Sequence, residues 1–246
     1  TIQTPRDLEG LKTAGRIVRL ALEAMRAAAR IGATTAQIDA VGARALDEHG
    51  ARSAPQLVYD FPGCACISVN DEVVHGVPGE RVIQPGDLIK IDVVAEKDGY
   101  MADATICVAV PPVSPQARAL AQCAEHAFYK AMSMARDGVA LRDMGRAIEQ
   151  SVARCGFSVV KELSGHGVGR TIHEAPRIVP NFYDKKLGEP MREGMVLAIE
   201  PIIAAGDGAI VEDGDGWTIR TADGSLASHF EHTIVITRSR PIVLTA

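Results

Sequence analysis

The sequence has few cysteines, no excess of basic residues and no long apolar run, and each absence excludes a class of protein. The cysteines are odd in number and form no Cys-x-x-Cys pair, so neither a disulfide framework nor a thiolate zinc site is indicated. They are Cys64, Cys66, Cys107, Cys123 and Cys155. A reducing compartment therefore fits this composition best.

Charge and hydropathy exclude further partners. The chain has 26 Lys and Arg against 31 Asp and Glu, a formal net charge of -5, and so lacks the basic excess typical of nucleic-acid-binding proteins. No apolar run approaches the roughly 18 residues that a membrane-spanning helix needs, and the N-terminus lacks the basic-then-apolar order of a signal peptide. We therefore expect a cytoplasmic protein with neither a nucleic-acid nor a membrane partner.

What the sequence does contain is ordinary for a globular protein. Its 246 residues are 47% apolar and 23% charged, which argues against disorder and against a coiled coil. The length is enough for one large domain or two small ones with a sizeable core.

Helices and strands are expected to alternate in two blocks. Thr4 is placed as an N-cap, with Pro5 in the first turn and Asp7 three residues after the cap. Hydrophobic spacing predicts four helices, at about residues 4–32, 35–50, 115–137 and 141–155. Val-rich extended segments follow the second helix, and more strands follow the fourth.

This order suggests an internal repeat. The segment 29–32, Ala-Arg-Ile-Gly, resembles the segment 135–138, Ala-Arg-Asp-Gly, and Gly50 and Gly156 are related by the same offset of 106 residues. We expect two halves, at about residues 4–110 and 114–240, joined by a proline-containing linker.

The most informative segment reads as a β-hairpin that carries two aspartates. Residues 88–94 and 100–106 are apolar and are separated by a turn. A turn centred between Lys97 and Asp98 would place Asp92 directly opposite Asp103, whereas a register shifted by one would leave one of them solvated. Two opposed carboxylates in an apolar strand context require a cation or a shared proton.

Two more strands each carry one glutamate among apolar residues, Glu200 and Glu231. Singly, each is better explained as a salt-bridged strand residue. Together with Asp92 and Asp103 they make four carboxylates on core strands, and two divalent cations would neutralise them. The charge count thus indicates a dinuclear metal site.

Histidines flanked by glycine or strand residues are candidates for the remaining chemistry. His166 lies in Gly-His-Gly-Val-Gly, where the backbone can approach a ligand closely, and His75 and His173 are, singly, more often structural. The glycine spacing matches no phosphate loop, and neither H-E-x-x-H nor G-x-S-x-G is present. A nucleotide site, a zincin and a serine hydrolase of the G-x-S-x-G type are therefore disfavoured.

These segments, taken in order, resemble the type I methionine aminopeptidases over nearly the whole chain. The matching segments are Asn70–Pro78, Ile91–Val93, Asp103, Gly165–Gly169, His173–Glu174, Ile199–Pro201 and Phe230–Thr233. The resemblance implies an α+β pita-bread fold, a single catalytic domain over residues 1–246 in which two pseudo-symmetric halves surround a curved antiparallel sheet.

The resemblance also implies the role of each site residue. Asp92 would bind one metal ion, His166 and Glu200 the other, and Asp103 and Glu231 would bridge the two. Oxygen-rich ligands with one imidazole suit manganese, iron(II) or cobalt, with zinc also compatible.

The catalytic groups of the family map onto His75, His173 and Glu200. Glu200 would carry a proton to the leaving amine, His173 would stabilise the oxyanion, and His75 would hydrogen-bond the scissile amide. Together these residues would support a monomeric enzyme that removes initiator methionine from nascent proteins, at the ribosome, when the next residue is small.

The substrate pocket matches less closely. Phe61, Cys66 and Trp217 fit an apolar, sulfur-tolerant methionine pocket that also includes His75 and His173. The family usually places a cysteine near Pro55, a tyrosine near Val58, a glycine at Asp60 and an aromatic residue at Ile172. We therefore expect a less aromatic pocket and a less strict preference for methionine.

Two alternative functions remain open at this point. One is a peptidase of the same fold with another specificity, for Xaa-Pro bonds or for a broader set of apolar first residues. The other is a non-catalytic binding protein, which would have no reason to keep all five ligands.

Overall fold

The computed structural model describes residues 1–246, and its elements follow the expected order of two helices and then strands, twice. The five helices are α1 (Pro5–Ala28), α2 (Thr35–Glu48), α3 (Ala54–Tyr59), α4 (Pro115–Met132) and α5 (Leu141–Arg154). The strands of the first half are β1 (Arg52–Ser53), β2 (Cys66–Val69), β3 (Glu72–Val74), β4 (Leu88–Lys97) and β5 (Tyr100–Ala109). Those of the second are β6 (Ser158–Val159), β7 (Gly165–Gly167), β8 (Glu174–Val179), β9 (Val196–Ile199), β10 (Ile202–Ala204), β11 (Ile210–Glu212), β12 (Ile219–Thr221), β13 (Ala227–His229), β14 (Glu231–Val235) and β15 (Ile242–Val243).

The start of α1 is set by its capping residues, as the sequence predicts. The Thr4 hydroxyl accepts a hydrogen bond from the Asp7 amide, and the Asp7 carboxylate accepts one from the Thr4 amide at 2.8 Å. The four long helices all lie where they were expected, although each ends between one and five residues earlier. The six-residue helix α3 was not predicted. None of the helices is long and apolar enough to cross a membrane.

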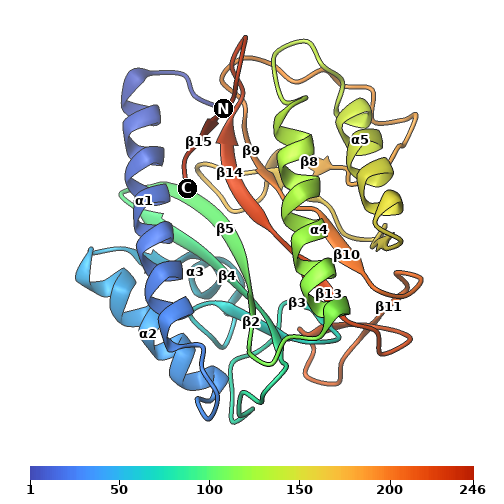
Figure 1. Ribbon diagram of the computed structural model, residues 1–246. Helices are drawn as coiled ribbons and strands as arrows, with labels where there is room; N and C mark the ends of the chain where they lie inside the picture. Colours follow the sequence, from blue (N-terminus) through green and yellow to red (C-terminus); the bar gives the residue numbers. More distant parts are fainter.

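A nine-stranded antiparallel sheet forms the centre of the fold. Its strand order is β1-β4-β5-β14-β9-β7-β8, with β2 also paired to β4 and β15 to β14. Two three-stranded sheets, β13-β10-β6 and β11-β12-β3, lie beside it. The first half of the chain thus meets the second where β5 pairs with β14 (Figure 1).

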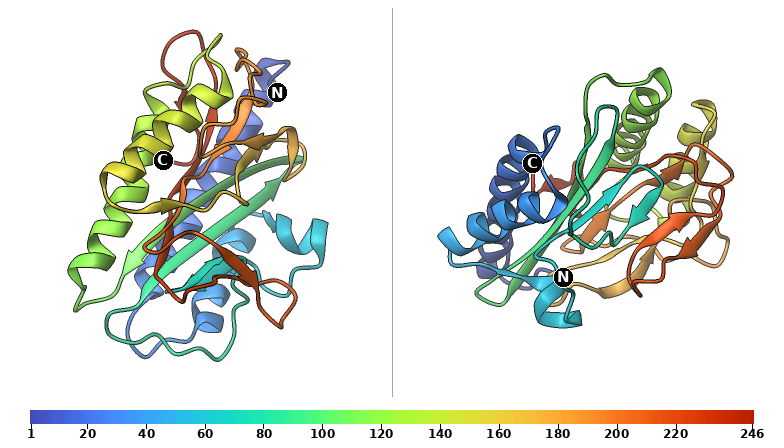
Figure 2. Two further views of the ribbon diagram at one scale, coloured as in Figure 1. Left: turned by 90° about the vertical axis from the view of Figure 1, so that its right-hand side faces the viewer. Right: turned by 90° about the horizontal axis from the view of Figure 1, so that it is seen from below.

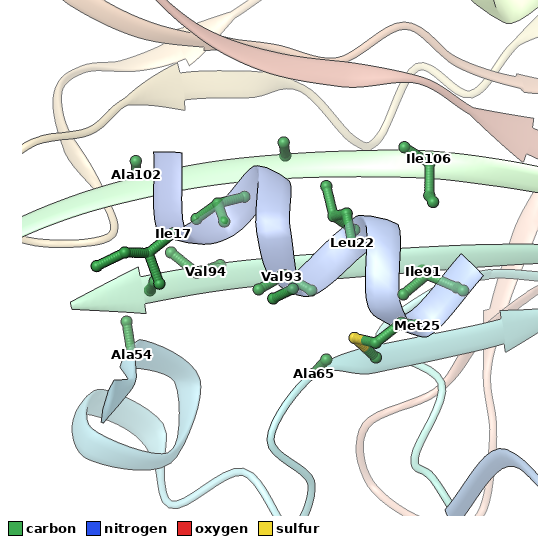
Figure 3. Packing of buried hydrophobic residues seen from close by; sticks show 14 of the residues in the cluster. Ile17, Leu22, Met25, Ala54, Ala65, Ile91, Val93, Val94, Ala102 and Ile106 are labelled. Atoms are coloured by element: carbon green, nitrogen blue, oxygen red, sulfur yellow. The ribbon is translucent and has the colours of Figure 1, made fainter. Parts of the chain in front are cut away.

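The two faces of this sheet differ because side chains alternate along each strand. On β4, Ile89, Ile91 and Val93 belong to the core beneath α1 and α2, while Asp92 points to the opposite face. Figure 3 shows Ile17, Leu22 and Met25 of α1 over Ile91 and Val93. A second core, beneath α4 and α5, contains Leu197 and Ile199 of β9 and Ile234 of β14. The four long helices cover one face (Figure 2), which leaves the other face for polar side chains.

The repeat glycines occupy equivalent backbone positions in the two halves. Gly32 and Gly138 follow α1 and α4 with φ of 87° and 83°, and Gly50 and Gly156 follow α2 and α5 with φ of 60° and 78°. Gly50 and Gly156 directly follow the caps of α2 and α5, and Gly32 and Gly138 lie in the turns beyond α1 and α4, so positive φ is the reason for glycine at all four points.

The register of the β4–β5 hairpin differs from the expected one by two residues. Asp92 pairs with Thr105, and Asp103 pairs with Val94, so the two aspartates are diagonal neighbours rather than directly opposed. The turn residues are Asp98 and Gly99, with φ of 51° and 81°, as a two-residue type I′ turn requires. Because strand side chains repeat every two residues, this shift keeps both aspartates on one face.

Candidate metal centre and active site

Five neighbouring strands of the sheet each bring one side chain to the face opposite the helices. Across the order β4, β5, β14, β9 and β7, these side chains are Asp92, Asp103, Glu231, Glu200 and His166. Glu200 directly follows β9, and each of the other four lies within its strand. The sheet therefore assembles four carboxylates and one imidazole from positions up to 139 residues apart, the interval between Asp92 and Glu231.

The imidazole lies between two of the carboxylates. His166 Nε2 is 3.7 Å from Asp103 Oδ2 and 3.6 Å from Glu200 Oε1. His166 Nδ1 lies 3.0 Å from the carbonyl oxygen of Gly167, which can only accept a hydrogen bond, so Nδ1 carries the proton. The Nε2 lone pair consequently faces the carboxylates, as metal binding requires.

Two groups of three side chains have ligand atoms close enough to share a cation. Asp103, His166 and Glu231 form one, and Asp92, His229 and Glu231 form the other; within each group the ligand atoms lie within 4.8 Å of one another. Glu231 belongs to both groups, as a bridging ligand would. His229 was not identified from the sequence, although it precedes Glu231 by two residues.

Burial of this many carboxylates raises their pKa values. Burial, followed by the charges of neighbouring carboxylates, raises the pKa values of Asp103, Glu200 and Glu231 well above the ordinary range. Burial also raises the pKa of Asp92 to about 6. Carboxylates held this close are therefore poorly accommodated unless cations or protons compensate them.

Three of the carboxylate oxygens in this group have no hydrogen-bond partner. They are Asp92 Oδ1, Asp103 Oδ1 and Glu231 Oε1, all buried. Buried polar atoms are nearly always paired, and unpaired oxygens that converge with an imidazole nitrogen fit divalent cations. The residues present thus suit a metal centre on the chemistry of their donors.

Two threonines form hydrogen bonds with acidic residues of the site and were missed from the sequence. Thr105, between Asp92 and Glu231 in the sheet, donates to Glu231 Oε2 at 2.9 Å. Thr233 accepts from the Asp103 amide and donates to the Asp103 carbonyl, both at 2.8 Å. Each lies two residues beyond an acidic residue of its own strand. Because alternate residues of a strand lie on one face, the sequence could have predicted that each threonine lies beside a site carboxylate.

The carboxylates form the floor of a cavity of about 440 Å³. Every site residue expected from the sequence lines it: Phe61, Cys66, His75, Asp92, Asp103, His166, His173, Glu200, Trp217 and Glu231. His75 and His173 are exposed to the cavity. The rings of His166 and His173 lie 4.2 Å apart between centroids, so His173 is directly beside a candidate ligand.

One wall of the cavity is apolar. Phe61 and Trp217 meet edge to face with ring centroids 5.1 Å apart, and Cys66 and Ile172 are buried beside them. Such a wall of aromatic rings and sulfur favours a flexible apolar side chain such as that of methionine.

Because of helix α3, one part of the pocket differs from what the sequence led us to expect. Pro55 and Tyr59 line the cavity because they lie four residues apart on one helical face, whereas Val58 and Asp60 do not. Val58 and Tyr59 are both 44% exposed, so position on the helix rather than exposure separates them, and Asp60 caps the helix in a left-handed conformation with φ of 56°. The expectation that Val58 shapes the pocket was therefore wrong, and Tyr59, missed from the sequence, lines it instead.

Comparison with known proteins gives a consistent family assignment. Residues 9–238 match the sequence model of "Metallopeptidase family M24". "Methionine aminopeptidase 2" of Bacillus subtilis is 45% identical over 245 residues, covering 99% of this chain and 98% of the relative. "Methionine aminopeptidase" of Aquifex aeolicus is 38% identical over 252 residues, with coverage of 99% and 98%.

Solved structures agree with this assignment. A methionine aminopeptidase from Thermotoga maritima superposes with a TM-score of 0.96 at 35% identity and covers 100% of this chain and 98% of its own. A prolidase from Pyrococcus horikoshii has a TM-score of 0.80 at 22% identity, and this chain covers 63% of it, a likeness of fold alone.

Proposed function

This chain belongs to metallopeptidase family M24, and on that premise we propose that it is an aminopeptidase that uses two divalent metal ions to remove an N-terminal methionine preceding a small residue. One observation carries the proposal: five neighbouring strands bring four carboxylates and an imidazole together beside an apolar cavity, and three of the carboxylate oxygens have no hydrogen-bond partner. It also makes the binding-protein alternative unattractive, because a binding site for a peptide has no need of these charges.

The ligands divide between two positions. We assign Asp92 to one ion, His166 and Glu200 to the other, and Asp103 and Glu231 to both. When bound, divalent cations lower the pKa of water and polarise a carbonyl group. An oxygen-rich set with one imidazole suits manganese, iron(II) or cobalt at least as well as zinc.

The protein's own groups position the peptide and move its protons. Glu200, whose pKa is raised by burial and by Glu231, is suited to accept a proton and to pass it to the leaving amine. His173 and His75 are both exposed to the cavity: His173 donates an N–H group to the scissile carbonyl oxygen, and His75 hydrogen-bonds the scissile amide.

The apolar wall selects the first residue of the substrate. Phe61, Cys66 and Trp217 would surround the methionine side chain, which has the length and flexibility to fill a pocket of rings and sulfur. Since initiator methionine is found on newly made chains, nascent proteins in the cytoplasm are the proposed source of substrate, met by a monomeric enzyme at the ribosome.

The test combines metal analysis with a panel of tripeptides. Purified protein should contain up to two divalent ions per chain and should hydrolyse Met-Ala-Ser after loading with manganese, iron(II) or cobalt. Norleucine and leucine in place of methionine should be cleaved more slowly, within the range of about 10- to 200-fold that small apolar differences produce. Efficient cleavage of Lys-Ala-Ser, or a sharp preference for proline after the cut, would contradict the methionine assignment.

A further inference from the structure

Helix α3 is a single short helix that is firmly attached to the wall of the cavity. The Ser53 hydroxyl caps it by accepting from the Gln56 amide, and the same hydroxyl donates to the Cys64 carbonyl at 2.7 Å. Pro55 lies in the first turn, and the αL residue Asp60 ends the helix. Tyr59 is consequently presented from a fixed position at the end of α3.

The hydroxyl of Tyr59 contacts Nδ1 of His173, and this is the one side-chain hydrogen bond that either residue makes. The two rings lie with centroids 5.8 Å apart at an interplanar angle of 46°. The residues are 114 positions apart in the chain, so the contact joins α3 to the start of β8.

The direction of this hydrogen bond follows from the available partners. A tyrosine hydroxyl is protonated at neutral pH, and burial raises the pKa of Tyr59 further. The Tyr59 proton has no other acceptor in the protein, so the hydroxyl donates and Nδ1 of His173 accepts. The proton of a neutral His173 ring then resides on Nε2, the nitrogen on the far side of the ring from Tyr59.

We propose that Tyr59 is a positioning residue, whose hydroxyl fixes both the ring orientation and the Nε2–H tautomer of His173. The inference rests on the proposed function, in which His173 donates to the scissile carbonyl oxygen. An imidazole ring can donate to a carbonyl oxygen only through an N–H group, and a ring that is flipped or in the other tautomer would present a carbon or a lone pair. Tyr59 therefore keeps the donor in place before the peptide arrives.

Kinetics of Tyr59→Phe give the first test, because this change removes only the hydroxyl. We expect kcat on Met-Ala-Ser to fall about 5- to 10-fold with KM nearly unchanged, since the lost hydrogen bond acts through the transition state. The matched control is Tyr129→Phe, which removes a hydroxyl from an exposed tyrosine on α4 and should leave kcat unchanged. Both variants should keep the metal content and melting temperature of the parent protein.

A nuclear magnetic resonance measurement tests the tautomer without relying on activity. In protein with ¹⁵N-labelled histidine and loaded with diamagnetic zinc, His173, assigned through His173→Ala, should show a protonated Nε2 and an unprotonated Nδ1. Tyr59→Phe should shift both resonances towards the average of the two tautomers, whereas Tyr129→Phe should not.

The outcomes separate this inference from the proposed function. A protonated Nδ1 in the parent protein, or a Tyr59→Phe variant with unchanged kcat and unchanged histidine resonances, would overturn the role of Tyr59. A parent protein that shows the expected tautomer but fails to hydrolyse Met-Ala-Ser would instead contradict the proposed function.

Discussion

At the residue scale, the site is marked by carboxylate oxygens that are buried without a hydrogen-bond partner. Asp103 Oδ1 and Glu231 Oε1 are buried without a partner, although Thr105 satisfies the other oxygen of Glu231. The Thr105 hydroxyl therefore occupies one oxygen of Glu231 and leaves the other free for a cation. The roles assigned to the ligands can be tested one residue at a time.

Asp103→Asn should abolish turnover, because a carboxylate shared by two cations supplies charge and geometry that an amide does not. Folding should persist, since the change also removes a buried negative charge that is close to Glu231, Asp92 and Glu200. The checks are kcat on Met-Ala-Ser after metal loading and circular dichroism of the same sample. A normal kcat in the metal-loaded variant would contradict the shared-ligand assignment, and loss of folding would point to a structural role.

His173→Ala should lower kcat by about 100-fold or more while changing KM little, because an oxyanion donor acts mainly in the transition state. The metal content should remain that of the parent protein, since His173 is assigned no metal. Steady-state kinetics and metal analysis on one preparation check both points. A variant that loses an ion would instead identify His173 as a ligand.

At the scale of elements, the hairpin β4–β5 determines where the two aspartates lie. Its type I′ turn needs positive φ at both Asp98 and Gly99. We expect Gly99→Ala to lower the free energy of unfolding by about 1–2 kcal/mol, because a Cβ disfavours this conformation. Urea denaturation measures the difference. Gly214→Ala is the matched control, since Gly214 lacks a left-handed φ and has open space around it; equal losses in the two variants would contradict the explanation.

The same hairpin indicates how far the sequence alone could predict the structure. The four long helices were predictable because caps and hydrophobic spacing agree over many residues, as at Thr4 and Asp7. The register was wrong by two residues because the Asp98-Gly99 pair was not recognised as the turn. The face of each aspartate was still right, since a two-residue shift preserves it.

The site could be predicted only in part from physical patterns. Charge counting found the carboxylates, but the roles assigned to His166, His75 and His173 depended on the family resemblance. Helix α3 was missed because six residues are too few to show a hydrophobic period. Tyr59 was missed with it, because contacts between distant segments leave no local signal.

At the scale of the whole molecule, the apolar cores beneath the helices stabilise the fold. This stability compensates for the repulsion among the buried carboxylates on the other face of the sheet. Two apolar cores lie beneath α1 and α2 and beneath α4 and α5, on the face away from the carboxylates. Folding energy from these cores offsets the repulsion within the site. Stability should therefore depend on metal and on pH through the site carboxylates.

Asp92→Asn tests this dependence, because burial raises the Asp92 pKa from 3.8 to about 6. Between these two values the folded metal-free protein binds a proton that the unfolded chain has released, so the parent protein loses stability as pH rises from about 4 to about 6. Asparagine does not titrate, and a shift of about two pKa units corresponds to about 3 kcal/mol. We therefore expect metal-free Asp92→Asn to become more stable than the metal-free parent protein as pH rises, by up to that amount above about pH 6.

Loading with metal should reverse this order at pH 7.5. Cations bind only the folded site, and they stabilise the parent protein more than a variant that lacks one ligand. Urea denaturation at pH 4.5 and 7.5, with and without manganese, measures all four differences, and Asp47→Asn, an exposed carboxylate outside the site, should show no such reversal. If Asp92→Asn remained less stable than the parent protein at pH 7.5 without metal, the carboxylate would be compensated by the protein itself, and the argument that its burial requires a cation would fail.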